Sequence, residues 1–159
     1  MVKKVLILCL IISLLCGCNS NKTINNPNYI MRVANYPVGS YSNIYLFNLE
    51  SDGTLSVSYG EGIPNKMQSG NFIKDDNFIT KQAVQEKVLS KIEFDELKKL
   101  IDEVHSRDVI SVNNYQLDGI ENIILINDKI YSFYEGEYTN DCFGKFIIDL
   151  KKYSPMNIK

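Results

Sequence analysis

The sequence predicts an α+β fold: an antiparallel sheet built from two main β-hairpins plus edge strands, with two amphipathic helices packed on one face. Two pairs of apolar runs are each separated by a short turn sequence, Ser51-Asp52-Gly53 and Asn127-Asp128. Asp-Gly is a strong hairpin signal because glycine accepts the positive φ that a tight turn requires. Two other segments repeat apolar residues every three or four positions, which is typical of helices with one buried side.

The first strand is predicted at residues 29–38, followed by a hairpin with arms at residues 43–49 and 54–59. Alternate residues of a strand point to the same side of a sheet. On one face of the first strand these are Tyr29, Met31 and Val33.

Residues 61–77 combine glycine, proline and polar side chains, and they are predicted as a long loop with one short strand near Phe72. Long irregular loops are often functional or mobile, so this loop is one candidate recognition surface. Tolerance of a surface insertion explains the same composition equally well. Residues 80–89 alternate moderately and are predicted as a strand that enters the first helix.

The first helix is marked by a capping box, in which the Ser90 hydroxyl accepts from the Glu93 amide and the Glu93 carboxylate reaches back to the Ser90 amide. Leu89 and Phe94 flank this cap as a hydrophobic staple. The apolar stripe comprises Phe94, Leu97, Leu100, Ile101 and Val104. The charged residues between these positions are expected to form a solvated face.

In the second half, residues 120–126 are almost continuously aliphatic and predict a buried central strand, and residues 130–135 form its return arm. The last helix carries its apolar stripe at Phe143, Phe146, Ile147 and Leu150. Thr139 or Asn140 is expected to cap this helix, with Asp141 favouring its N-terminal dipole. Pro155 prevents its continuation.

The two hairpins resemble one another, because each has an apolar arm bounded by asparagine and a return arm that ends in Tyr-Gly-Glu or Tyr-Glu-Gly. Each is later followed by a helix. A duplicated hairpin-plus-helix unit would explain this likeness and would produce a pseudo-twofold sheet. Two unrelated hairpins in an asparagine-rich chain would share the same features.

The N-terminus has the layout of a secretory signal, with Lys3 and Lys4 before an aliphatic run at residues 5–15. The run is too short for a membrane-spanning helix, which needs roughly 20 residues. Leu15-x-Gly17-Cys18 resembles the bacterial lipobox, which implies cleavage before Cys18 and acyl chains on its thiol. The expected organisation is a signal peptide at residues 1–17, a tether at 18–28 and one domain at 29–159. The alternatives are an ordinary secreted protein with an accidental Gly-Cys and an uncleaved signal anchor.

Cleavage at that point leaves Cys18 and Cys142 as the only cysteines, so with Cys18 lipidated no intrachain disulfide can form. A small buried apolar residue is the preferred interpretation of Cys142, and a reactive thiol is the alternative. Removing Lys3 and Lys4 leaves 15 basic and 19 acidic residues, a net charge of −4. This acidity argues against a nucleic-acid partner.

Candidate site residues are few, and we predict no catalytic residue, metal or cofactor. His105, the single histidine, is interpreted as a cation at a helix C-terminus. Acid–base chemistry could use the carboxylates of Asp118, Glu121, Glu135 and Glu137 only if burial raised their pKa values.

Tyrosine is abundant at recognition surfaces and in half-buried strands alike. The candidate binding surface comprises Tyr59, Tyr131, Tyr134 and Tyr138.

The second half also resembles small uncharacterised lipoproteins of low-GC Gram-positive bacteria. The residues concerned are Leu89-Ser90 with Phe94-x-x-Leu97, Ile130-Tyr131-x-Phe133-Tyr134, and Leu150 with Ser154-Pro155. The resemblance covers roughly residues 84–158 through generic motifs. It implies no activity and supplies no site residues.

The leading hypothesis is a non-catalytic binding module, anchored to the lipid bilayer through Cys18 on the extracytoplasmic side of the cell membrane, whose partner is an envelope protein or a peptide. One alternative is an envelope enzyme or accessory hydrolase factor that uses carboxylates, which a buried cluster of Glu135, Glu137 and Asp118 would favour. An immunity-type lipoprotein that neutralises an exported toxin is the other. An exposed patch around Tyr131 and Tyr134 would favour binding.

Overall fold

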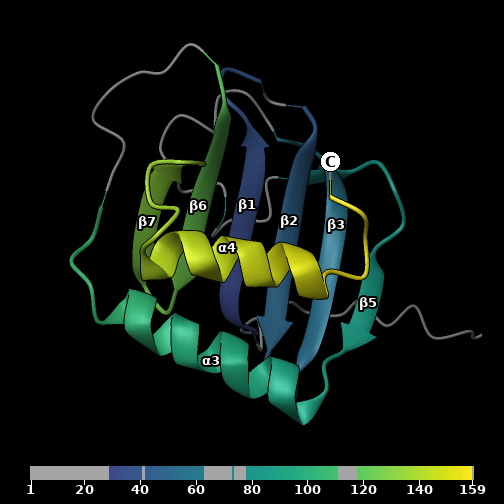
Figure 1. The fold of residues 1–159 in the computed structure, drawn as a ribbon. Coiled ribbons are helices and arrows are strands. Elements are labelled where there is room, and N and C mark those ends of the chain that lie inside the picture. The colour runs from purple at the N-terminus through teal and green to yellow at the C-terminus, as the bar shows by residue number, and fades with distance from the viewer. Residues whose placement is uncertain (1–28, 41, 63–72, 74–77, 111–117, 159) are drawn as a thin grey trace, which may run out of the picture.

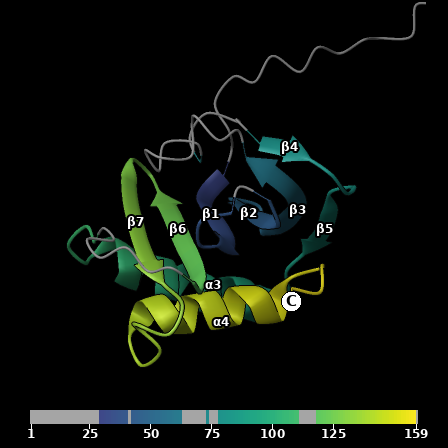
Figure 2. The same ribbon diagram turned by 90° about the horizontal axis from the view of Figure 1, so that it is seen from above.

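The computed structural model describes residues 29–40, 42–62, 73, 78–110 and 118–158. It confirms the predicted α+β class: an antiparallel sheet with two helices across one face (Figures 1 and 2). The strand order is β4-β3-β2-β1-β6-β7, and β5 also pairs with β3. The chain therefore builds one side of the sheet first and reaches the other side only after the first helix.

The central strand is β1 (Tyr29–Pro37), which pairs with β2 (Ile44–Glu50) on one side and with β6 (Ile120–Ile126) on the other. β2 and β3 (Thr54–Gly62) form the predicted first hairpin, whose turn contains Gly53 at a φ of 88°. The prediction that Tyr29 shares a face with Met31 and Val33 is wrong. The register with β2 shifts between Tyr29 and Met31, which sends the Tyr29 ring to the opposite side of the sheet.

The second predicted hairpin is formed by β6 and β7 (Lys129–Tyr134). Asn127 occupies the turn at a φ of 52°, a conformation that asparagine tolerates better than most residues. The four consecutive residues 123–126 are all buried, and their side chains face the two sides of the sheet alternately. The prediction of a buried strand here is confirmed, and β6 lies inside the sheet between β1 and the edge strand β7.

The predicted strand at residues 80–89 is instead two short strands, β4 (Phe78–Thr80) and β5 (Gln85–Val88). Ile79 pairs with Glu61, whereas Gln85 pairs with Val57, so the edge strand has two more residues than the part of β3 that it accompanies. The amides of Lys81 and Gln82 both donate to the Tyr59 carbonyl, at 2.9 and 3.2 Å. This bulge interrupts the edge strand.

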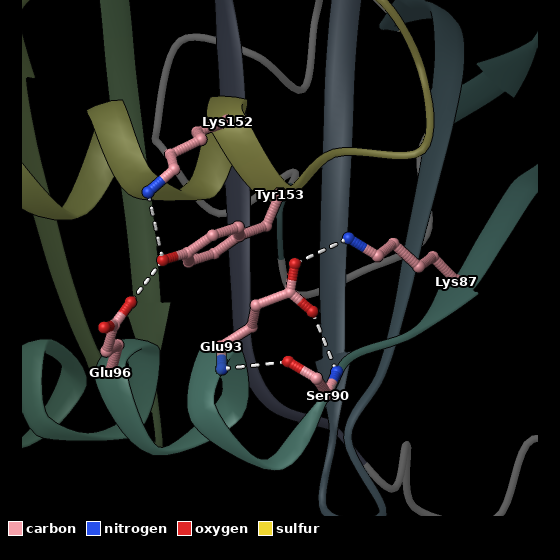
Figure 3. A network of polar contacts seen from close by, with 6 residues as sticks. All are labelled: Lys87, Ser90, Glu93, Glu96, Lys152 and Tyr153. Atoms are coloured by element: carbon pink, nitrogen blue, oxygen red, sulfur yellow. Dashed lines mark hydrogen bonds and ion pairs between the residues drawn. The ribbon is translucent and has the colours of Figure 1, made fainter.

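Helix α3 (Lys91–His105) begins at the predicted capping box, as Figure 3 shows. Ser90 Oγ accepts from the Glu93 amide, while Glu93 Oε2 accepts from the Ser90 amide at 2.8 Å. Leu97, Ile101 and Val104 are buried, and Phe94 and Leu100 pack partly against the core. The predicted stripe is therefore the face that contacts the sheet.

Helix α4 (Cys142–Tyr153) crosses the same face of the sheet (Figure 1). Its cap is Asp141 and neither Thr139 nor Asn140, because the Asp141 carboxylate accepts from the Cys142 amide. All four predicted stripe residues are buried. The helix ends at Tyr153, two residues before Pro155.

The apolar core has two parts on the two faces of the sheet. The larger part lies between the sheet and both helices. On the opposite face, Ala34, Leu46 and Ile123 pack around Ile73, whose carbonyl accepts from Arg32 Nη1 at 2.9 Å. Glu61 and Gly62, predicted as loop, belong to β3, whereas the predicted strand near Phe72 lies outside the described residues.

The arrangement of the hairpins does not form a pseudo-twofold sheet. β2 and β6 are both antiparallel to β1, so they run parallel to each other. A twofold axis normal to the sheet would make them antiparallel, and an axis along β1 would place the two helices on opposite faces. In the structure β2 and β6 run parallel and both helices cover one face (Figure 2), a combination that neither axis allows.

Candidate functional site

The predicted tyrosine surface is not a single surface in the structure. Tyr131 and Tyr134 are 0% and 4% exposed, which corrects their assignment to a binding face. The Tyr131 ring packs in the helix-covered core, 5.7 Å from the Phe143 ring, and burial raises the pKa of its phenol. Tyr134 points to the other side of the sheet because it lies three positions along the same strand.

Tyr59 and Tyr138 remain partly exposed, but they belong to different sides of the molecule. Tyr59 on β3 packs 5.0 Å from Tyr45, and its hydroxyl donates to Asn43 Oδ1. Tyr138 precedes α4 and packs 5.6 Å from Phe133, a residue of β7. Strands β2, β1 and β6 lie between β3 and β7, so these two tyrosines cannot form one patch.

The candidate carboxylates also lie apart and in solvent. Asp118, Glu135 and Glu137 are exposed, so they do not form the buried cluster that would favour an enzyme. Glu135 forms an ion pair with Lys151 at 2.9 Å, and Glu137 accepts from the Tyr134 amide at 2.9 Å. Glu121 is half-buried and accepts from the Ser132 hydroxyl at 2.7 Å. The Glu135 pair joins the turn after β7 to the end of α4, whereas the Glu137 bond is within that turn and the Glu121 bond joins β6 to β7.

His105 and Cys142 lie at the ends of the two helices. His105 is the last residue of α3, and its carbonyl accepts from Lys129 Nζ at 3.2 Å. Cys142 is buried, and burial raises the pKa of its thiol, as expected for a small apolar residue in the core. Within the described ranges, no group of His, Cys, Asp and Glu side chains could hold a metal ion.

A shallow polar hollow lies where the loop after β7 meets the N-terminus of α4. It is lined by Arg107, Glu137, Tyr138, Thr139, Asn140 and Asp141. Arg107 Nη2 lies 3.7 Å from Asp141 Oδ1, and the hydrogen bonds from Cys142 lower the pKa of Asp141. The carboxylate in this hollow therefore serves to cap the helix, and it is already opposite a guanidinium group.

The most distinctive surface is one edge of the sheet. Of the six large apolar side chains that are exposed among the described residues, four lie between residues 79 and 92. They are Ile79 on β4, Val84 before β5, Val88 on β5 and Ile92 in the first turn of α3. β4 and β5 both pair with the same side of β3 (Figure 2), so we call this set the apolar edge. Along it, Ile79 points to the helix-covered face of the sheet and Val88 to the opposite face.

The two edges of the sheet differ in their backbone contacts. On β7, the outward-facing Ser132 amide donates to the Ile110 carbonyl at 3.0 Å, and the Tyr134 amide donates to Glu137. β5 pairs with β3 alone in the described structure. Unpaired amides and carbonyls along an edge strand are a template for another strand. The β7 edge is thus occupied by the chain itself, whereas the described residues leave the β5 edge open.

The sequence prediction missed this surface, although one signal pointed to it. Ile92 falls outside the helical stripe that begins at Phe94, and Val84 and Val88 lie in a strand interrupted by charges. Those apolar residues had no assigned place in the core. Val84 lies in the bulge between β4 and β5, which the alternation pattern alone does not reveal.

Among the helices that the structure describes, none has the length and hydropathy needed to cross a membrane. No protein-family model matches the chain, and no curated protein matches it. The motif at Cys18 and the apolar edge are the two features from which a function can be inferred.

Proposed function

We propose that the protein is a lipid-anchored, extracytoplasmic binding module that holds a protein partner at its apolar edge and performs no catalysis itself. The proposal rests on four exposed apolar side chains that follow one another along the edge strand and into α3, beside a β5 edge that no other described strand pairs with. Isolated exposed apolar residues are ordinary on protein surfaces, whereas grouped ones mark interaction sites.

The location follows from the N-terminal motif. A charged start, an aliphatic run and Leu15-x-Gly17-Cys18 together favour export and lipidation at Cys18. Two or more acyl chains hold a protein stably on a bilayer. The tether at residues 18–28 has eleven residues, which span at most about 40 Å when extended. The domain would therefore act close to the membrane surface.

The energetics of the apolar edge favour association. Val88 and Ile92 are each 72% exposed. Fully burying a side chain of this size contributes about 1.5–3 kcal/mol. Covering the four residues would supply several kcal/mol toward association before the costs of ordering a partner. Such a contribution suits a specific complex between membrane-associated proteins.

Site-specific photocross-linking in intact cells tests this proposal. A photoreactive amino acid placed at Val88 is expected to form a discrete cross-linked product with one protein. The same probe at Ile148, which is 58% exposed on α4, serves as the matched control and is expected to form none. Equal products from both positions, or none from Val88, would refute the assignment of the binding surface.

A further inference from the structure

We infer that the apolar edge receives its partner as an added β-strand, supplied by an extended segment of a different protein. This inference rests on the proposed function, because it specifies how the same edge is occupied. Strand addition to an exposed sheet edge is a common mode of peptide recognition. The hydrogen-bond polarity of β5, its side-chain directions and its charges specify the partner.

The polarity of β5 is fixed by its register with β3. The Leu89 amide donates to the Gly53 carbonyl at 3.0 Å, and Lys87 lies opposite Leu55 in the same register. Hydrogen-bonded pairs alternate along an antiparallel ladder, so the amide and carbonyl of Lys87 point toward β3. The amides and carbonyls of Glu86 and Val88 therefore face away from the sheet. Nothing in the described structure hydrogen-bonds to them.

A second copy of this chain fits the edge poorly. Pairing all four residues of β5 across a twofold axis would set Glu86 opposite Lys87. An outward-facing residue would then meet an inward-facing one, and no ladder could form. Registers centred on Glu86 or on Lys87 place like charges directly opposite each other, which is destabilising. Each twofold register that aligns two or more residues of β5 is thus disfavoured, and we assign the edge to a segment of another protein.

The side chains of β5 define the chemistry of that segment. Val88 and Glu86 lie opposite Thr54 and Ser56, so they point away from the helices. An added strand would place one residue beside each of them, two positions apart. An apolar residue complements Val88, and a lysine or arginine complements Glu86.

The residue between these two positions would point to the helix-covered side. There it would meet Lys87, whose ammonium group lies 2.8 Å from Glu93 Oε1 and 5.9 Å from the centre of the Tyr153 ring (Figure 3). Because this lysine is already paired, the partner residue needs no charge. The preferred segment is therefore apolar, neutral, then basic, in extended conformation.

Amide hydrogen exchange measured by NMR on the lipidated full chain in detergent micelles tests this inference. The probe is a synthetic peptide, Thr-Val-Thr-Lys-Thr-Val-Thr, at millimolar concentration. The amides of Glu86 and Val88 are expected to become protected, while the amide of Lys87, already bonded to β3, is expected to change little. A peptide with glutamate in place of lysine is expected to bind about fivefold more weakly.

The Val88→Pro variant removes one outward donor and leaves the bonds to β3 intact, because proline is tolerated on the open side of an edge strand. We expect it to abolish protection at Glu86. Strand addition would be overturned if the peptide protected neither Glu86 nor Val88 in the wild type. It would also be overturned if the peptide protected Glu86 equally in the wild type and in the proline variant. If the Val88 cross-link still forms in either case, the proposed function stands and only the mode of binding is wrong.

Discussion

Gly144 lies so close to the loop before α4 that only a residue without a side chain fits there. A Cβ at this position would lie 2.2 Å from the Tyr138 carbonyl oxygen and 2.7 Å from Thr139 Cα. Both contacts are with backbone atoms, which cannot move without displacing the loop. Glycine is therefore required here for close approach of two backbone segments.

We expect Gly144→Ala to destabilise the protein by about 1–3 kcal/mol, because the overlap outweighs the better helix propensity of alanine. Urea denaturation of the purified protein measures this change. Lys145→Ala, at the exposed neighbouring position, should change the free energy of unfolding by less than about 0.5 kcal/mol. Equal effects of the two substitutions would contradict the account of the loop.

The ionisation of Glu93 is linked to folding through the capping box and the Lys87 ion pair. Hydrogen bonds from Lys87 and Ser90 lower the pKa of its carboxyl from 4.5 to about 2. The folded chain therefore binds a proton less readily than the unfolded chain does. The resulting stabilisation is complete above a pH of about 4.5 and is lost as the pH falls toward about 2.

Glu93→Gln tests this linkage, because glutamine can still form the capping box but carries no charge. We expect the wild type to be the more stable protein at neutral pH and the difference to shrink as the pH falls below about 4.5. Thermal unfolding followed by circular dichroism over this pH range measures the difference. A difference that does not vary with pH would show that the charge of Glu93 makes no contribution.

At the scale of elements, the two helices are held on the sheet mainly by their apolar stripes. Leu97 is fully buried at the centre of α3, and Leu150 is similarly buried on α4. The helices also contact each other through polar groups, since the Tyr153 hydroxyl donates to Glu96 Oε2 (Figure 3). This contact ties the end of α4 to the first half of α3.

Leu97→Ala is expected to lower the free energy of unfolding by about 2–5 kcal/mol, because it removes a buried side chain and leaves a cavity. Lys98→Ala, on the exposed side of the same turn, should have little effect. Urea denaturation distinguishes the two. Similar small losses from both variants would mean that α3 contributes little to the folded core.

The helices and hairpins could be predicted because their signals are local. Ser90 and Glu93 mark a helix start within four residues, and Gly53 marks a turn by its own conformational freedom. The bulge between β4 and β5 could not be predicted in this way. It depends on how two stretches of the edge strand each pair with β3, which is a long-range property.

At the scale of the molecule, the candidate site was the part least accessible to sequence reasoning. Tyr131 and Val88 are both of residue types that are common in strands, yet Tyr131 is fully buried whereas Val88 is 72% exposed. Alternation predicts which residues share a face, but coverage of each face depends on where the helices pack. Strand order, with β6 beside β1, was equally invisible to local patterns.

Mass spectrometry of the mature chain tests the proposed lipidation at Cys18 directly. Trypsin should release an N-terminal peptide spanning residues 18–22 that carries the mass of a diacylglyceryl group. The peptide containing Cys142 should carry no lipid and serves as the internal control. An unmodified Cys18 peptide, or a mature N-terminus elsewhere, would exclude the lipoprotein assignment.

The most direct test of the central claim is affinity purification from gently solubilised native membranes with three tagged proteins: wild type, Val88→Lys and Val109→Lys. Val109 is exposed to 58% and lies away from the apolar edge, so it is the matched control. We predict that wild type and Val109→Lys recover the same stoichiometric partner and that Val88→Lys loses it. Recovery of that partner by Val88→Lys at the wild-type level would contradict binding through the apolar edge.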